Sequence, residues 1–327
     1  MTLRGCLRRP VTVPPSGLRR WLLRPMFDAR GVRGWVRAVL FAALVVLAVM
    51  LLMVLIRALA LTVPAHLRQA LGAVFHRPRA GAGFSPWFAG LNELGLLACA
   101  LCASSLMVWL DGRRLREVGL APRRRLREFA GGAAVGVVMI TLLVAGLVIT
   151  GGARLELPVV SAGAALGWGL AWAAAAVLVG LFEEIAFRGY LFVTLREDYG
   201  FWTATVAVAV LFTLAHGVNP GENPLGMLTA GLASVLFCLG IRRTGALWWA
   251  IGCHAAWDWS ENFFYGSADS GIHSMGRLFR LEPHGNLYLS GGTVGPEGSV
   301  LCFVVLLAAI LAVPRLVPRG TAIKSTS

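Results

Sequence analysis

Ionisable side chains stand inside long apolar stretches of this sequence, where a charge is costly and is by default a candidate for function. The richest stretch reads Leu-Phe-Glu-Glu-Ile-Ala-Phe-Arg-Gly and ends at Gly189. Within it, Glu184 and Arg188 are four residues apart, so on a helix they share one face and can pair. Glu183 points about 100° away from Glu184. Arg188 then neutralises one carboxylate, and the other is free to act as a general base. The alternative is that both glutamates lie at the solvated cytoplasmic end of a helix and have no catalytic role.

Two histidines on later apolar segments add to this first group. His216 ends a Phe-Thr-Leu-Ala-His run, and His254 stands four residues before Asp258, so that those two share a helix face. If the chain turns near Gly200, Glu184 and His216 are equally far from the turn. An antiparallel helix pair would then bring them to the same depth in the membrane. Glutamate, histidine and aspartate gathered in one apolar bundle are a set that can activate water.

In order and spacing, these three pieces resemble the signature motifs of the CAAX-protease and bacteriocin-processing (CPBP, or Abi) family of intramembrane endopeptidases. The family patterns are E-E-x-x-x-R, F-x-x-x-H and H-x-x-x-[N/D], and the resemblance covers about residues 110–264. It implies endoproteolysis within or beside the membrane, on prenylated C-terminal CAAX sequences or on bacteriocin-type peptides and membrane proteins. It also implies a role for each motif position. Glu183 would activate the water, His216 would help to hold it, His254 and Asp258 would stabilise the tetrahedral oxyanion, and Glu184 and Arg188 would support the site structurally.

One position departs from the commonest family pattern, which has Asn where this chain has Asp258. An ionised carboxylate cannot donate a hydrogen bond to an oxyanion. Asp258 must therefore be protonated, orient His254, or bind a metal. Nitrogen and oxygen ligands of this kind suit Zn²⁺. The candidate metal ligands are Glu183, His216, His254 and Asp258. We expect metal-free chemistry, with zinc as the alternative cofactor.

Two other kinds of function use similar residues. A non-proteolytic member of the same family would act in membrane immunity or as a scaffold, although this chain keeps every motif residue. A transporter would use the histidines and carboxylates as an ion relay, but the sequence shows no pair of matching halves. The motifs H-E-x-x-H, G-x-S-x-G and Gly-Asp, typical of other proteases, are absent.

The elements that must position these residues are membrane helices. Of the 327 residues, 57% are hydrophobic and 14% are charged, with a mean hydropathy of +0.72, which excludes a soluble globular enzyme and a disordered chain. We predict an all-α, polytopic transmembrane helical bundle of about eight helices. The expected spans are Ala38–Val63, Trp87–Leu110, Phe129–Thr150, a fourth from Ala162, Phe201–Gly217, Leu225–Ile241, Ala246–Phe264 and Ser299–Val313.

Positive charge fixes the expected orientation. Counted outside the eight spans, 23 Lys and Arg residues fall on one side and six on the other. This asymmetry predicts that both termini are cytoplasmic, in a multi-pass protein of the plasma membrane, that is, a bacterial inner membrane. The net charge of +14 follows from the same distribution, so we expect no nucleic-acid partner. The expected partners are membrane lipid and a membrane-associated peptide or protein substrate.

The chain divides into five expected regions: a basic cytoplasmic tail (1–37), two N-terminal helices (38–110), the catalytic helical core (111–264), an outward loop (265–298), and a last helix with a cytoplasmic tail (299–327). In the loop, His273 and His284 are expected at the solvated surface, although the loop could also form a lid. Outside the motifs, Arg57 and Glu93 are expected to form a structural ion pair between the first two helices.

Overall fold

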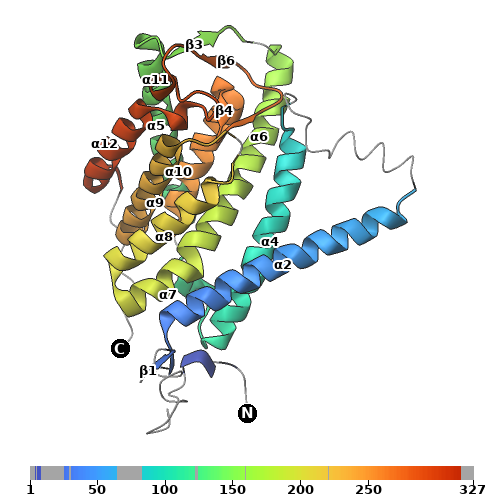
Figure 1. Ribbon diagram of the computed structural model, residues 1–327, viewed down its shortest axis with the longest axis vertical. Coiled ribbons are helices and arrows are strands. Elements are labelled where there is room, and N and C mark those ends of the chain that lie inside the picture. Colours follow the sequence, from blue (N-terminus) through green and yellow to red (C-terminus); the bar gives the residue numbers. More distant parts are fainter. Residues whose placement is uncertain are drawn as a thin grey trace.

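A computed structural model describes residues 4, 6–8, 26–28, 31–64, 83–121, 124–158, 160–219 and 221–317. The chain is mostly helical, and its helices form one bundle (Figure 1). Short strands and turns form a small cap at one end of this bundle. The bundle helices are α2 (Gly34–Thr62), α4 (Pro86–Leu110), α5 (Arg125–Ile149), α6 (Ala162–Glu183), α7 (Tyr190–Tyr199), α8 (Phe201–His216), α9 (Pro224–Thr244), α10 (Trp248–Trp259) and α12 (Val300–Leu316).

Each of the eight expected ranges coincides with a helical segment. Within the described residues, five helices are long and apolar enough to cross a membrane: α2, α4, α5, α9 and the continuous helix Ala162–Tyr199. Two further apolar helices, α8 and α12, are shorter, and α10 has 12 residues. The chain is therefore a helical membrane protein. The number of crossings and the side on which the termini lie stay predictions.

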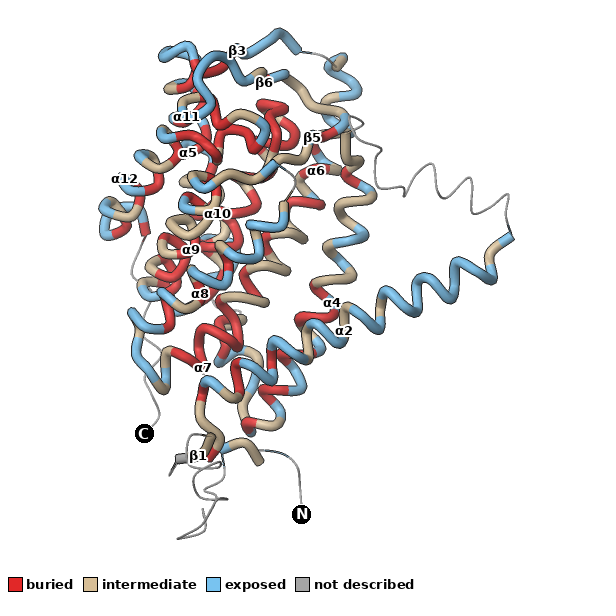
Figure 2. The backbone as a smooth tube through the Cα atoms, viewed as in Figure 1, coloured by how far each residue is buried: buried red, intermediate tan, exposed pale blue. Residues whose placement is uncertain are grey.

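The short helix α10 lies at the centre of the bundle and packs against α5, α6 and α9. Figure 2 shows buried residues gathered along α10 and its neighbours, whereas α2 is exposed along most of its length. Glycines allow the closest of these contacts. A Cβ atom on Gly132 of α5 would lie 2.0 Å from the Trp249 carbonyl oxygen, and one on Gly252 of α10 would lie 2.1 Å from that of Phe129. Small residues at such crossings let helix backbones approach closely in a membrane.

Two stretches of wider, π-helical turn interrupt otherwise regular helices. The first, η3 (Glu184–Gly189), joins α6 to α7, and the second, η4 (Ser260–Tyr265), continues α10. Such segments are frequent at functional sites. The first covers most of the E-E-x-x-x-R motif and the second begins two residues after Asp258, so both adjoin the residues singled out by sequence.

At the cytoplasmic end expected from the charge distribution, buried polar groups tie three helices together. Arg37 of α2 pairs with Asp111 at 3.1 Å, and Tyr190 of α7 donates a hydrogen bond to the same carboxylate at 3.0 Å. Arg37 also lies 3.5 Å from Asp198 of α7. These contacts anchor the N-terminal half of α2 beside the helix that carries the first motif. Nearby are the short elements η1 (Cys6–Arg8), β1 (Phe27–Asp28), β2 (Gly31–Val32) and η2 (Leu115–Val118).

The expected outward loop is a folded cap rather than a simple connection. Strand β3 (Ala153–Glu156) pairs antiparallel with β6 (Arg280–Pro283), and β4 (Ala268–Asp269) forms a hairpin with β5 (Ile272–His273). Short helices α11 (Leu287–Ser290) and η5 (Pro296–Gly298) complete it. The predicted all-α class is therefore correct for the bundle. It is incomplete for the cap, which contains short β-strands. His273 and His284 are exposed, as expected.

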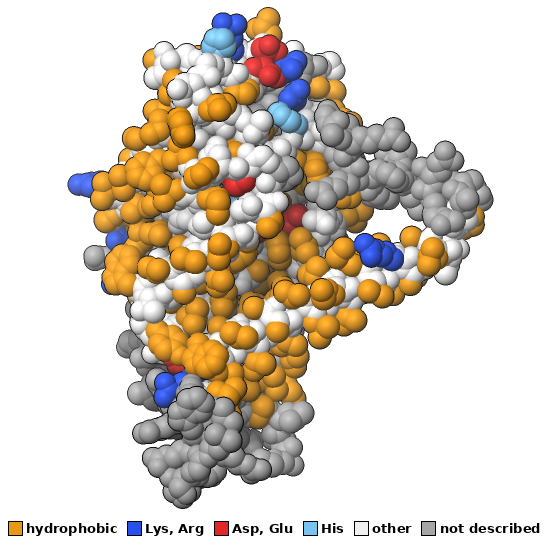
Figure 3. All heavy atoms as spheres, viewed as in Figure 1, with side chains coloured by type: hydrophobic (Ala, Val, Ile, Leu, Met, Phe, Trp, Pro, Cys, Tyr) orange, Lys and Arg blue, Asp and Glu red, His pale blue; other side chains and the backbone are white. Residues whose placement is uncertain are grey.

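The surface has the distribution of a membrane protein. Figure 3 shows hydrophobic side chains over much of the helical part of this face, while charged side chains gather mostly toward the cap end. Many of the exposed large hydrophobic residues belong to α2, the helix with the least buried surface. An apolar surface of this extent is expected where lipid, rather than water, is the neighbour.

Candidate active site

The first motif supplies a buried ion pair. Arg188 and Glu184 are both fully buried, and a guanidinium nitrogen of Arg188 lies 3.2 Å from Glu184 Oε1. The guanidinium also lies over the ring of Phe212, 4.0 Å from its centroid, which is a favourable cation–π arrangement. The pairing expected from the four-residue spacing is therefore present, and it survives the π-helical turn in which the two residues lie.

Glu184 also orients the histidine of the third motif. The Nδ1 atom of His254 lies 3.1 Å from Glu184 Oε1, and the imidazole stacks on Phe237 with a centroid distance of 5.2 Å. When Nδ1 donates its proton to Glu184, the other ring nitrogen is directed at the remaining motif groups. That atom, Nε2, lies 3.6 Å from Glu183 Oε2 and 3.8 Å from Asp258 Oδ2.

Glu183 has the carboxylate that is free to react. Its Oε2 atom is buried and has no hydrogen-bond partner. The side chain lines a cavity of about 260 Å³, which is also lined by His216, His254 and Asp258. The structure therefore brings together the four side chains proposed from sequence, from the end of α6, the end of α8 and the middle of α10. The space beside the Glu183 carboxylate is large enough for water and a peptide group.

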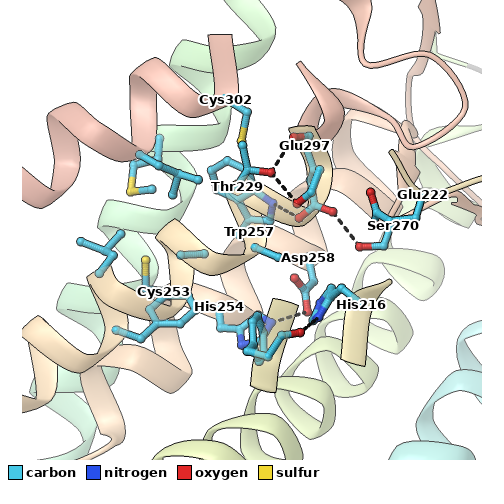
Figure 4. A pocket seen from close by; sticks show the side chains of 18 residues that line it. His216, Glu222, Thr229, Cys253, His254, Trp257, Asp258, Ser270, Glu297 and Cys302 are labelled. Atoms are coloured by element: carbon cyan, nitrogen blue, oxygen red, sulfur yellow. Dashed lines mark hydrogen bonds and ion pairs between the residues drawn. The ribbon is translucent and has the colours of Figure 1, made fainter. Parts of the chain in front are cut away.

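His216 is positioned by its own helix. Its Nδ1 atom hydrogen-bonds to the Phe212 carbonyl oxygen at 2.9 Å, which leaves Nε2 available to the cavity. In Figure 4, His216, His254 and Asp258 lie close together on one side of the adjoining pocket, with Ser270 and Glu297 on the other. The pocket therefore joins the motif residues to polar groups that come from the cap.

The four motif side chains do not bring three ligand atoms within 4.8 Å of one another. Two pairs are close: His254 Nε2 lies 3.6 Å from Glu183 Oε2 and 3.8 Å from Asp258 Oδ2. Two atoms that bind one zinc ion at about 2.0–2.2 Å lie up to about 4 Å apart, so these pairs do not exclude the ion. In the described part of the chain, the group of three ligand atoms within 4.8 Å of one another is a different one: Glu261, Asp269 and Glu297.

Several residues of the cavity were not predicted as site residues. The outer wall includes Asn262, Asp269, Ser270 and Glu297, which come from η4, the β4–β5 hairpin and η5. Burial, together with the charge of Glu297, raises the pKa of Asp269 to about 7. Carboxylates are therefore crowded at this rim. The sequence signal was weak, because these residues lie in a polar loop and only the folded cap brings them to the cavity.

Glu93 is another cavity residue, and the prediction that it pairs with Arg57 is wrong. Glu93 accepts a hydrogen bond from Asn92 at 2.9 Å and lines the same cavity as Glu183. Among the described residues, no ion pair joins Glu93 to Arg57. The reason is visible in Figure 1, where α2 diverges from α4 toward its C-terminal end. Equal depth in the membrane therefore does not bring the two side chains together.

Comparison with known proteins agrees with this geometry. The model of the family described as Type II CAAX prenyl endopeptidase Rce1-like matches residues 165–260. That segment contains nearly all of α6, then η3 and α7–α10, and with them all three motifs. No curated protein and no solved structure matches the chain. The resemblance drawn from the motifs is confirmed over residues 165–260, which match this family model and supply the four motif side chains of the cavity.

Proposed function

We propose that this protein is an intramembrane endopeptidase that hydrolyses a peptide bond in a membrane-associated protein or peptide of the CAAX type. The observation that carries the proposal is the Glu183 oxygen that accepts no hydrogen bond, in a cavity shared with His216, His254 and Asp258. The family match adds support, because type II CAAX prenyl endopeptidases are proteases. The substrate and the plasma-membrane location remain part of the proposal.

In the proposed reaction, Glu183 takes a proton from a water held between it and His216. The water oxygen forms a bond to the peptide carbonyl carbon, and the carbonyl oxygen becomes an oxyanion. His254, protonated on both nitrogens, donates its Nε2–H to that oxyanion, and Glu184 stabilises the imidazolium through Nδ1. Glu183 then passes the proton to the leaving nitrogen as the peptide C–N bond breaks. The products are a carboxylic acid and an amine, and the acid then passes its proton to the amine to give a carboxylate and an ammonium group.

A pocket beside the motif residues, apolar over part of its wall, supports a lipid-modified substrate. The apolar part includes Met139, Leu236, Phe237 and Leu306, and the pocket shares both motif histidines and the motif aspartate with the cavity. The apolar part of the wall favours a hydrocarbon chain. A prenyl group attached to the substrate would thus hold the scissile bond near the motif. A bacteriocin-type peptide is the alternative substrate.

The proposal can be tested with purified protein in proteoliposomes and a peptide that carries a prenylated C-terminal CAAX sequence. The wild type is expected to produce a new carboxyl terminus, detected by mass spectrometry, and to cut the unprenylated peptide far more slowly. Glu183→Gln is expected to lose at least about 100-fold in rate. The matched control is Glu282→Gln, in the cap on β6. A folded wild type that cuts neither peptide would favour the non-proteolytic scaffold or immunity function.

A further inference from the structure

Three carboxylates meet beside the cavity, two of them in its lining, and none of them belongs to the protease motifs. Glu261 comes from η4, Asp269 from β4 and Glu297 from η5, so that three separate segments contribute one side chain each. One carboxylate oxygen of each lies within 4.8 Å of those of the other two. Such spacing is what oxygen ligands on opposite or adjacent corners of one cation require.

Glu261 is the residue that points to a ligand. It is fully buried, and neither of its carboxylate oxygens has a hydrogen-bond partner. In the part of the chain that the structure describes, no ion pair joins Glu261, Asp269 or Glu297 to Arg, Lys or His. A buried carboxylate without a partner is costly unless it binds a proton or a cation. Its aim into the carboxylate group favours the cation.

The other two carboxylates are already oriented by neutral donors. The indole N–H of Trp257 donates to Glu297 Oε1 at 3.2 Å, and the Ser270 hydroxyl donates to Glu297 Oε2 at 2.7 Å. The amide of Asn262 donates to Asp269 Oδ2. These donors fix the geometry of the two carboxylates without supplying positive charge. Outer-shell hydrogen bonds of this kind are typical of metal-binding carboxylates.

The chemistry of the group favours calcium over other divalent cations. All three ligands are carboxylate oxygens, which suit hard cations rather than zinc. Calcium accepts oxygen atoms at about 2.3–2.6 Å in irregular geometry, whereas magnesium demands a near-ideal octahedron and keeps its water. Because three separate segments supply the ligands, we expect their arrangement around the ion to be irregular rather than octahedral.

We propose that Glu261, Asp269 and Glu297 bind one calcium ion, which fastens the cap to the end of α10. Glu261 lies three residues after Asp258, so the ion would fix the wall of the proteolytic cavity without taking part in its chemistry. This inference does not depend on the proposed protease activity. It assigns the ion to residues outside the three motifs.

The test uses the purified full chain in detergent, stripped with a chelator and titrated with Tb³⁺ as a luminescent calcium substitute. Tb³⁺ bound beside Trp257 accepts excitation energy from the indole, so binding is read directly. The wild type is expected to give a saturable signal that Ca²⁺ displaces, and Ca²⁺ alone is expected to raise its thermal unfolding midpoint. Glu261→Gln is expected to weaken binding by at least about tenfold.

Two control variants separate this site from others. Glu282→Gln changes a cap carboxylate that is paired with Arg280, and Glu183→Gln changes the motif carboxylate. Both are expected to bind Tb³⁺ as the wild type does. A wild type without a Ca²⁺-displaceable signal overturns the proposal, as does binding that is lost in Glu183→Gln or unchanged in Glu261→Gln. If Glu261→Gln does not fold, Glu297→Gln takes its place with the same expectations.

Discussion

The Oε1 atom of Glu184 lies 3.2 Å from Arg188 and 3.1 Å from His254, so a single carboxylate oxygen connects the structural and the reactive halves of the site. Spacing alone predicted the contact to Arg188, because residues four apart on a helix are neighbours. It could not predict the contact to His254, which lies 70 residues later. That contact depends on how α10 is packed against the first motif.

Removing Arg188 should therefore destabilise the protein rather than only slow it. Arg188→Ala would leave the buried Glu184 carboxylate without its cation, and breaking one side of a buried pair costs about 3 to 5 kcal/mol. We expect a lower thermal unfolding midpoint in detergent and less folded protein in membranes. The control is Arg116→Ala at an exposed position. Equal stability of the two variants would contradict the structural role of the pair.

Variants of Asp258 test whether this residue donates a hydrogen bond to the oxyanion. Its carboxylate is 3.8 Å from His254 Nε2, too far for a hydrogen bond. If Asp258 acts as a donor, Asp258→Asn should keep most of the cleavage rate, because the amide supplies an N–H, whereas Asp258→Ala should lose about 100-fold. Rates on the prenylated peptide decide this. Loss of activity in both variants would show that an ionised carboxylate is needed instead.

At the scale of elements, the apolar ranges predicted most helices to within a few residues. The fifth expected span, Phe201–Gly217, is α8 (Phe201–His216) in the structure. The two π-helical segments could not be predicted, because the period of apolar residues does not mark one wider turn. The pairing of strands in the cap could not be predicted from the sequence either. β3 and β6 are more than 120 residues apart in sequence, and nothing local indicates that they meet. For the same reason Asp269 and Glu297 were missed as cavity residues.

The close contact between α5 and α10 can be tested by substituting two adjacent glycines of α5. Gly132→Ala would place a methyl group 2.0 Å from the Trp249 carbonyl oxygen, so the helices would have to separate. Overpacking of this kind costs about 1 to 3 kcal/mol. At Gly131, by contrast, an added Cβ meets nothing within 4 Å. We expect Gly132→Ala to lower the unfolding midpoint and Gly131→Ala to leave it unchanged or higher. The reverse order would contradict this packing.

At the scale of the whole molecule, the lining of the cavity extends beyond the segment that matches the family model. Residues 165–260 provide all four motif side chains, but α4 contributes Asn92 and Glu93 and the cap contributes Asp269 and Glu297. The helix α4 and the cap therefore complete the walls of the site.

The predicted orientation can be checked by cysteine labelling in intact cells. Tyr288→Cys lies on the exposed cap and should react with a membrane-impermeant maleimide. Arg116→Cys, exposed at the opposite end of the bundle near η2, should react only after the membrane is opened. Wild-type protein with its six native cysteines gives the background. The opposite labelling pattern would place the termini outside and contradict the charge-based prediction.

In the proposed function, the Glu183 carboxylate drives peptide-bond hydrolysis. The most direct measurement is terminal-peptide mass spectrometry on cells that express wild type or Glu183→Gln at equal levels, since it does not require a known substrate. New protein termini should appear with the wild type and be absent with Glu183→Gln. Identical sets of termini in both cell populations would contradict this function and would favour a non-proteolytic scaffold or immunity protein.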